Sequence, residues 1–241
     1  MNNKKIFIEK TFKMNINLDS EKVNKFEEFM NHMLLWNERV RLTSITDENE
    51  IIDKHFIDSL TVVNTKLFDG HKKVMDMGTG GGFPGIPLKF YNDEIELTMI
   101  DSRLKKIEYL ETVIEKFNLK NTFALHGRAE DYGRDNEYRE KFDVVVSRAV
   151  AELATLAEFC LPFVSVNGYF VAMKGSEVED ELNDANKAIS ILGGKVEKIM
   201  KFQLPDSDFS RSIIVIKKVE LTPKSYPRTS GKPKKKPIKG W

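Results

Sequence analysis

A glycine-rich segment follows a short apolar run in the first half of the chain. It reads Val-Met-Asp-Met-Gly-Thr-Gly-Gly-Gly-Phe-Pro-Gly over residues 74–85. Glycines let a backbone turn sharply and lie against a ligand without a Cβ in the way, and a helix that follows presents free N–H groups. The segment therefore predicts a loop on which a flat or anionic ligand packs, such as a nucleotide cofactor. Gly80, Gly82 and Gly85 also satisfy the dinucleotide-binding pattern.

An acid at the end of the apolar run favours one class of cofactor. Asp76 comes two residues before Gly78 and four before Gly80. A carboxylate at this place would repel a pyrophosphate, but it suits a ligand that carries an ammonium and a sulfonium. S-adenosylmethionine has both groups, so we expect Asp76, Gly78 and Gly80 to contact this cofactor.

Further acids follow the next two predicted strands. Asp101 closes the second strand, where a carboxylate can accept both hydroxyls of a ribose. Ala129 and Glu130 lie in a turn after the third strand, where an acid could accept the amino group of adenine. These residues predict a nucleoside site, but by themselves they leave both a dinucleotide and S-adenosylmethionine possible.

Cationic residues follow the later strands. Arg148 comes after the fourth strand, Lys174 after the fifth, and Arg211 at the start of the last. Arginine and lysine at one rim of a sheet suit contacts with RNA phosphates. Arg148, Lys174 and Arg211 are therefore candidate RNA contacts.

The elements that must position these residues alternate between strand and helix. Five β-rich runs are separated by helical patterns, which indicates an open α/β sheet with parallel strands. A last pair of runs has no helix between its members and should be antiparallel. This order predicts a class I S-adenosylmethionine-dependent methyltransferase sheet of the Rossmann-like type. The predicted strands are 73–77, 95–100, 122–125, 142–147, 168–173, 195–203 and 211–218.

The chain divides by composition into three parts. Apolar residues at helical spacing predict helices over about 20–38 and after Asp47, so residues 1–70 should form an N-terminal helical cap. We expect residues 71–218 to form the methyltransferase domain. Residues 219–241 read as a flexible basic tail. From Lys217 onward the chain carries a charge of +8 and the remainder about −7, although the total is +1.

The lysines of this tail suit RNA phosphates. Lys234, Lys235 and Lys236 are therefore candidate RNA contacts, and a solvated terminus without a partner is the alternative.

Composition excludes several classes of protein. Hydrophobic residues make up 41% of the 241 residues and charged residues 31%, which is typical of a folded globular protein. Cys160 is the single cysteine, so disulfides and multi-cysteine zinc sites are excluded, and we expect no metal. No apolar run reaches the length of a membrane span. We therefore expect a cytoplasmic monomer that has no membrane partner.

Several motifs together resemble one family. The motifs are Leu42-Thr-Ser44, His55-Phe-Ile-Asp58-Ser-Leu60, Asp76 to Pro87, Ser147-Arg148-Ala149, Lys174-Gly175 and Arg211. They are similar to those of the RsmG family, also called glucose-inhibited division protein B. Gly81 departs from the pattern, since many relatives have proline there, and we expect a looser turn.

The resemblance implies the activity and its site. The family transfers a methyl group from S-adenosylmethionine to N7 of a guanosine, position 527 in the 530 loop of bacterial 16S ribosomal RNA. The partner would be that RNA or the small ribosomal subunit. Cofactor-contacting positions carried over by motif are Gly78, Phe83, Ala129, Glu130 and Arg148.

The residues agree with this chemistry. Guanine N7 has a lone pair and no proton, so no general base is needed, and the enzyme must mainly align the reactants. A grip on N7 by an arginine would block the attack. We therefore assign Arg148 to orienting the cofactor and the RNA, with Lys174 as a second positioning candidate. Methylation of cytosine C5 would need a cysteine nucleophile. We expect Cys160, the single cysteine, to lie in the core, which argues against that reaction. Two rival functions are a non-catalytic RNA-binding or ribosome-assembly factor and an NAD-dependent oxidoreductase.

Overall fold

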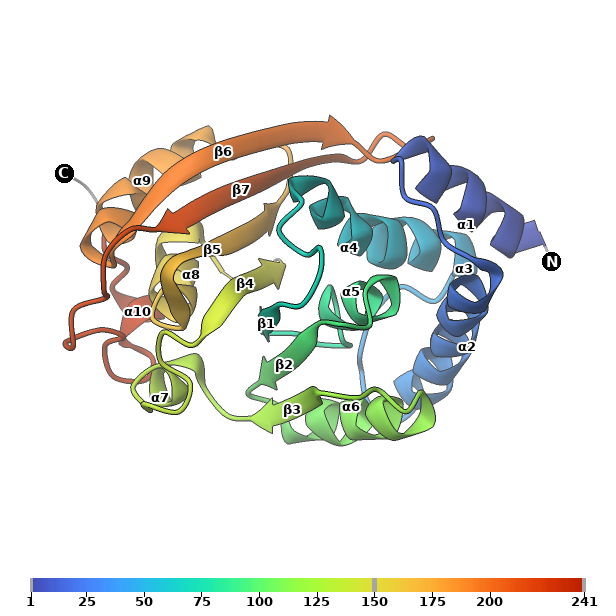
Figure 1. Cartoon of the computed structure of the whole chain (residues 1–241), viewed down its shortest axis with the longest axis horizontal. Helices are drawn as coiled ribbons and strands as arrows, with labels where there is room; N and C mark the ends of the chain where they lie inside the picture. The colour runs from blue at the N-terminus through green and yellow to red at the C-terminus, as the bar shows by residue number, and fades with distance from the viewer. Residues whose placement is uncertain (1, 149–150, 240–241) are drawn as a thin grey trace.

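A computed structural model describes residues 2–148 and 151–239 of the chain. Its centre is a seven-stranded sheet with the order β3-β2-β1-β4-β5-β7-β6 (Figure 1). Strands β1 to β5 are parallel, and β7 pairs antiparallel with both β5 and β6. The strands are β1 (Lys73–Met77), β2 (Glu96–Asp101), β3 (Thr122–His126), β4 (Phe142–Arg148), β5 (Val164–Lys174), β6 (Gly194–Gln203) and β7 (Ser210–Lys218).

This architecture confirms the fold class expected from the sequence. Every strand falls within a few residues of its predicted bounds, and the last two are antiparallel because only a short turn joins them. The order reverses direction at β1, where β2 lies on one side and β4 on the other. In open α/β sheets, ligands bind at the carboxyl ends of the strands at such a switch point.

The two faces of the sheet carry separate hydrophobic cores. Along β1 the side chains alternate: Val74 packs in one core, and Met75 and Met77 pack in the other. The first core includes the N-terminal helices, α5 (Gly85–Tyr91) and α6 (Leu104–Lys116), and the second includes α8 (Leu153–Cys160) and α9 (Glu179–Ile191). Helices therefore cover both faces, as Figure 1 shows.

The N-terminal helices pack on the first core. They are α1 (Asn2–Lys13), α2 (Ser20–Asn37), α3 (Glu48–Ile51), α4 (Asp58–Leu60), and two irregular turns, η1 (Ile52–Ile57) and η2 (Thr61–Thr65). The predicted helix over 20–38 is confirmed as α2, with Asp19 as its N-cap. The second predicted helix forms, but it contains a π-helical turn, η1, which the apolar spacing did not predict.

The C-terminal segment differs from the expected free tail. Residues 219–239 return from β7 along α8 and α7 (Ala129–Tyr132) and end in a short helix, α10 (Lys232–Lys235) (Figure 1). Arg139 donates hydrogen bonds to the carbonyls of Thr222 and Tyr226, at 2.6 and 2.8 Å. The prolines of this segment and its lack of apolar periodicity exclude a long helix, but they do not exclude an extended path that is held by contacts with the domain. The sequence pattern therefore could not distinguish a free tail from a fixed one. Residues 240 and 241 lie outside the described part.

Candidate functional site

The glycine-rich loop connects β1 to α5 in a conformation that needs glycine. Gly78, Gly80 and Gly82 have φ of +72°, +61° and +92°, a region that other residues rarely adopt. A Cβ on Gly82 would lie 2.8 Å from Cγ1 of Ile86 and 3.1 Å from Cδ2 of Leu110. Gly82 therefore allows α5 and α6 to approach the loop closely.

Asp76, near the end of β1, binds this loop through hydrogen bonds. Its carboxylate is fully buried, and Oδ2 accepts hydrogen bonds from Thr79 Oγ1 at 2.7 Å and from the Gly85 N–H at 2.8 Å. Burial raises the pKa of Asp76 to about 6, and the hydrogen bonds from Thr79 and Gly85 oppose the rise. The carboxylate thus contacts the loop and not a surface cavity, and direct contact between Asp76 and a cofactor stays a prediction.

A pocket lies at the carboxyl ends of β1 and β2. We call it the strand-end pocket. Four of the predicted cofactor residues line it, namely Gly78, Asp101, Ala129 and Glu130. Its other lining residues are Met77, Ile100, Ser102, Gly127, Arg128, Phe159, Gly231 and Lys234. The first loop glycine and the acids after two successive strands are therefore brought together, as the sequence predicted.

The acids of the strand-end pocket already make backbone contacts. Asp101 accepts hydrogen bonds from the N–H of Gly80 at 3.1 Å and from the N–H of Arg103 at 2.9 Å. Glu130 accepts one from the N–H of Gly231 at 2.8 Å. These bonds fix both carboxylates at the rim. The set of backbone N–H groups, glycines and acids fits a nucleoside with hydroxyl and amino donors.

A second pocket brings the predicted cations together. We call it the cationic pocket. It is lined by Arg148, Lys174 and Arg211, together with Ile45, Lys54, His55, Asp58, Met173 and Gly175. Arg148 ends β4, Lys174 ends β5 and Arg211 lies near the start of the antiparallel β7, so the three meet at one edge of the sheet. Four cations in one hollow suit an anionic or electron-rich ligand.

Asp58 organises the cationic pocket. Its buried carboxylate accepts a hydrogen bond from Arg211 Nε at 2.9 Å and another from Arg148 Nη1 at 3.1 Å. Arg148 also donates to the carbonyl of Lys54 at 2.9 Å. Because η1 and α4 carry His55 and Asp58, the π-helical turn sets where these groups lie. π-helical turns frequently occur at functional sites.

His55 and Phe83 form the floor between the loop and this pocket. Their rings stack with centroids 4.7 Å apart, and the Arg148 guanidinium lies 5.1 Å from the Phe83 ring. Burial, with a smaller contribution from the charge of Arg148, lowers the pKa of His55 to about 4, so its ring is neutral at pH 7. Thr43 makes a 2.8 Å hydrogen bond to His55 Nε2.

Phe83 and Arg148 are not among the residues that line the strand-end pocket. Gly80 is near Lys106 and Asp101. Cofactor contact by these three residues stays a prediction. Ala149, part of a predicted motif, lies outside the described residues.

Lys174 is held by neighbours. Its ammonium donates to Glu181 Oε1 at 2.5 Å and to the carbonyl of Ala151 at 2.7 Å. The predicted RNA-binding lysines separate: Lys234 lines the strand-end pocket, while Lys235 and Lys236 are exposed. RNA contact by each of these residues stays a prediction.

Sequence reasoning missed two parts of the site. The first is the pairing of Asp58 with both arginines, and the second is the contribution of Gly231 and Lys234 to the strand-end pocket. A carboxylate in the second helical pattern was a usable signal for the former. Nothing in the local pattern around Gly231 indicated the latter, because its neighbour Glu130 lies 101 residues away.

Cys160 lies in the second core and is fully buried. Burial raises the pKa of its thiol well above the usual value. A buried, protonated thiol is a poor nucleophile. The expectation that Cys160 is a core residue is therefore confirmed.

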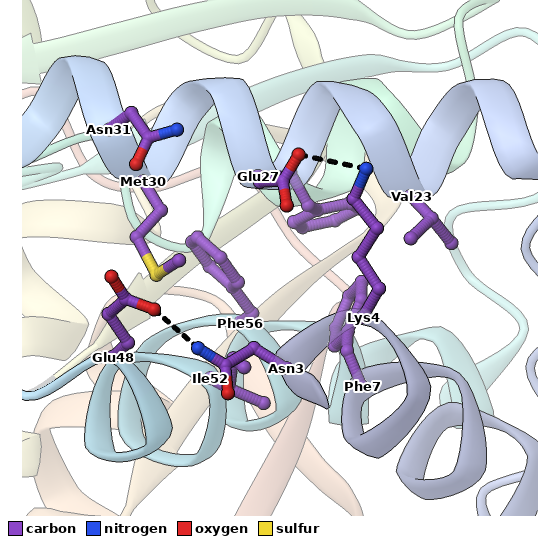
Figure 2. Close-up of a pocket in the computed structure, with 11 residues that line it drawn as sticks. Asn3, Lys4, Phe7, Val23, Glu27, Met30, Asn31, Glu48, Ile52 and Phe56 are labelled. Atoms are coloured by element: carbon purple, nitrogen blue, oxygen red, sulfur yellow. Dashed lines mark hydrogen bonds and ion pairs between the residues drawn. The ribbon is translucent and has the colours of Figure 1, made fainter. Parts of the chain in front are cut away.

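Another cavity lies among the N-terminal helices, away from the predicted residues. Figure 2 shows it between α1, α2 and η1, with Phe7, Met30 and Phe56 on its walls. An ion pair between Lys4 and Glu27, with 2.8 Å between the charged atoms, borders it. Among residues 2–148 and 151–239, no helix is long and apolar enough to cross a membrane, and no cluster of three metal-ligating side chains occurs.

Comparisons with known proteins agree on one family. The profile of the family described as rRNA small subunit methyltransferase G matches residues 22–213. A protein named ribosomal RNA small subunit methyltransferase G from Clostridium botulinum (strain 657 / Type Ba4) is 47% identical, over 94% of this chain and 95% of its own length. Proteins of the same name from Clostridium novyi and Acetivibrio thermocellus are 45% and 47% identical, over 99% and 98% of this chain and 100% and 96% of their own lengths.

Solved structures agree on the fold. A SAM-dependent methyltransferase from Aquifex aeolicus superposes with a TM-score of 0.53 at 15% identity, over 73% of this chain and 96% of that chain. Fibrillarin from Aeropyrum pernix, solved with natively bound S-adenosyl-L-methionine, gives a TM-score of 0.50 at 13% identity, over 62% of this chain and 67% of that chain. At these identities the likeness shows the fold alone.

Proposed function

The chain belongs to the rRNA small subunit methyltransferase G family, and from this premise we propose that it transfers a methyl group from S-adenosylmethionine to N7 of a guanosine in 16S ribosomal RNA. By the family resemblance the guanosine is position 527 in the 530 loop. The observation that carries the proposal is the occurrence of two adjoining features, a nucleoside-type pocket at the strand ends and a cationic pocket at the ends of β4 and β5.

The strand-end pocket fits S-adenosylmethionine. In this proposal Asp101 accepts the ribose hydroxyls and Glu130 accepts the adenine amino group, which is supported by the position of both residues in the pocket lining. Gly78 also lines this pocket, and its φ of +72° is one that glycine readily adopts. When bound, this cofactor supplies an electrophilic methyl group on a sulfonium.

The cationic pocket fits the RNA. Arg148, Lys174 and Arg211 supply fixed positive charge for phosphates or for the oxygen of a guanine. Their partners Asp58 and Glu181 orient these cations but do not occupy all of their N–H donors. The Arg148 guanidinium lies against the ring of Phe83 in the glycine-rich loop. We therefore expect Arg148 to align the RNA with the cofactor.

No residue has to remove a proton in this reaction. Guanine N7 has a lone pair and no hydrogen, so alignment and exclusion of water are the main tasks of the protein. His55 is neutral and hydrogen-bonded to Thr43, which suits a positioning role. The proposed chemistry therefore needs no proton transfer to His55 or Asp58, although both line the cationic pocket.

Mapping of methylated guanosines tests the proposal. Ribosomal RNA from cells with and without the gene would be compared by cleavage at N7-methylguanosine, and purified protein would be titrated calorimetrically with S-adenosylmethionine. We expect one guanosine in 16S RNA to lose its methyl group without the gene. An unchanged methylation map, or no heat on titration, would contradict the proposed function. Methyl transfer by the purified protein would exclude a purely structural ribosome-assembly role.

A further inference from the structure

The C-terminal segment does more than cover the surface. We define residues 226–239 as the C-terminal strap. We propose that the C-terminal strap is a wall of the cofactor site, in which the Gly231 N–H positions Glu130 and the Lys234 ammonium contacts the nucleoside part of the cofactor. This inference rests on the proposed function, because it concerns the site for S-adenosylmethionine.

The strap is anchored on the elements that form the pocket. Arg228 donates to both carboxylate oxygens of Glu158 on α8, at 2.6 to 3.0 Å, and the Glu158 side chain is 1% exposed. Arg134 Nε donates to the carbonyl of Pro227 at 2.9 Å. A Cβ on Gly133, which directly follows α7, would lie 3.0 Å from Pro227. The strap therefore takes one fixed path over α7 and α8.

That path brings Gly231 and Lys234 to the rim of the strand-end pocket. Both residues line it together with Asp101 and Glu130. Between them, Pro233 is buried, and its carbonyl accepts a hydrogen bond from Thr155 on α8 at 3.4 Å. Removing the strap would thus open one side of the pocket to water.

Glu130 is oriented by this contact. Its Oε1 accepts the Gly231 N–H at 2.8 Å, while Oε2 has no hydrogen-bond partner among the described residues. A carboxylate held through one oxygen presents the other in a defined direction. The Gly231 N–H is in this sense a positioning group, and Oε2 of Glu130 is left for a donor such as the adenine amino group.

Lys234 differs from Lys232, Lys235 and Lys236 of the strap in lining the strand-end pocket. Arg228 and Lys239 form ion pairs with Glu158 and with Glu152 and Asp184. Lys234 lines the pocket and has no ion pair within 2–148 and 151–239. Its ammonium can donate to the acceptor atoms that a nucleoside offers, the ring nitrogens and ribose oxygens. Lys232, on the same short helix, is exposed and does not line the pocket.

The first test uses the unmodified protein. Trypsin cuts after Lys234 and Lys235 only when the strap leaves its position, so the rate of cleavage reports the open population. If the cofactor site includes the strap, S-adenosylhomocysteine at about 100 times its Kd should slow this cleavage at least tenfold. Cleavage after Lys5 in α1 is the internal control and should not change. Equal rates of strap cleavage with and without the ligand would overturn the inference.

The second test compares Lys234→Ala with the matched control Lys232→Ala. Both residues are exposed, so neither change should impair folding, which thermal melting would verify. Calorimetry with S-adenosylhomocysteine should show affinity reduced by roughly three- to tenfold for Lys234→Ala, the net scale of one solvent-exposed hydrogen bond. Lys232→Ala should bind as the unmodified protein does.

The outcomes separate the two proposals. Unmodified protein that does not bind S-adenosylhomocysteine at all would overturn the proposed function and this inference together. Binding by the unmodified protein with equal affinity for both lysine variants would overturn this inference and leave the proposed function standing. A loss confined to Lys234→Ala, with ligand protection of the strap, supports the inference.

Discussion

Asp58 is one carboxylate that serves two arginines far apart in the sequence. Its oxygens bind Arg148 and Arg211, and its side chain is 7% exposed. Loss of the charge would leave two largely buried cations without their shared partner. The positions of both arginines therefore depend on this residue.

Asp58→Asn should destabilise the fold by about 3 kcal/mol. It should also lower methyl transfer to RNA at least tenfold, because misplaced arginines align the RNA poorly. S-adenosylhomocysteine affinity should fall much less than the transfer rate, since Asp58 itself is outside the strand-end pocket. Denaturant melting, transfer kinetics and calorimetry provide the three measurements.

Glu21→Gln is the control, because Glu21 forms an exposed i,i+4 pair with Lys25 and such pairs contribute little. Equal stability and transfer rates for the Asp58 and Glu21 variants would contradict this role of Asp58.

His55 gives stability a defined pH dependence. The folded state holds its pKa at about 4, below the ordinary value of 6.5, so the unfolded chain takes up the proton first as pH falls. Stability should decline from about pH 6.5 down to about pH 4, by at most roughly 3 kcal/mol. His55→Gln should remove this part of the decline. Denaturant unfolding curves of both proteins over a pH series would measure the decline. If the stability of both proteins declined equally between pH 6.5 and 4, His55 would not be its cause.

At the scale of elements, the glycine-rich loop depends on two glycines in different ways. Gly82 has φ of +92° and no room for a Cβ, whereas Gly81 lacks a positive φ and a Cβ there would lie 3.4 Å from the Phe83 ring and 3.7 Å from Leu42. The glycine at 81 is therefore not required by the backbone. The looser turn expected from the sequence stays a prediction.

Gly82→Ala should cost about 2 kcal/mol or more, because it combines strained φ with contacts to Ile86 and Leu110. Gly81→Ala is the matched control and should change stability by no more than about 0.5 kcal/mol. Calorimetric titration with S-adenosylhomocysteine should show weaker binding for the first variant only. The reverse order of effects would contradict the loop geometry.

The strap is the second element with a testable anchor. Arg228→Ala would leave the buried Glu158 carboxylate unpaired, at a cost of about 3–5 kcal/mol. The double variant Arg228→Ala, Glu158→Gln should recover part of this loss, because the uncompensated charge is gone. Denaturant unfolding measures both. A double variant less stable than the single one would show that the charge is not the cause.

At the scale of the whole molecule, charge is concentrated at one end of the sequence. The segment from Lys217 carries +8 in a chain of net charge +1. Lys234 lines the strand-end pocket, Lys218 is buried beside Glu140, and Lys232, Lys235 and Lys236 are exposed. Removal of the entire segment would therefore damage the cofactor site as well as any RNA contact. Substitution of the outward lysines separates the two effects.

The triple variant Lys232→Ala, Lys235→Ala, Lys236→Ala should bind RNA with a flatter salt dependence. The slope of log affinity against log salt should fall by up to about 2, as expected for three lost phosphate contacts to single-stranded RNA. Affinity for S-adenosylhomocysteine should not change. Filter binding over a range of salt concentrations measures the slope, and a slope equal to that of the unmodified protein would exclude these lysines from the RNA interface.

Local pattern was sufficient for the sheet and the loop. Alternating apolar runs of strand and helix type determine which segments pair and which cover them, because burial on both faces requires that periodicity. Glycines at 78, 80 and 82 and the acids at 76, 101 and 130 are informative for the same reason, since each stands at a strand end or turn where its type is restricted. These glycines and acids could be expected to lie near one another, because the carboxyl ends of parallel strands meet at the same edge of a sheet.

Only the tertiary structure decided which charged groups share a partner. Asp58 with Arg211, Glu158 with Arg228 and Glu130 with Gly231 are joined across 70 to 153 residues. No periodicity connects such positions, because their contact depends on how helices pack and on the path of the C-terminal strap. Sequence therefore determined the class of fold and the chemistry of the glycine-rich loop, and packing decided that a basic terminus becomes a wall of the pocket.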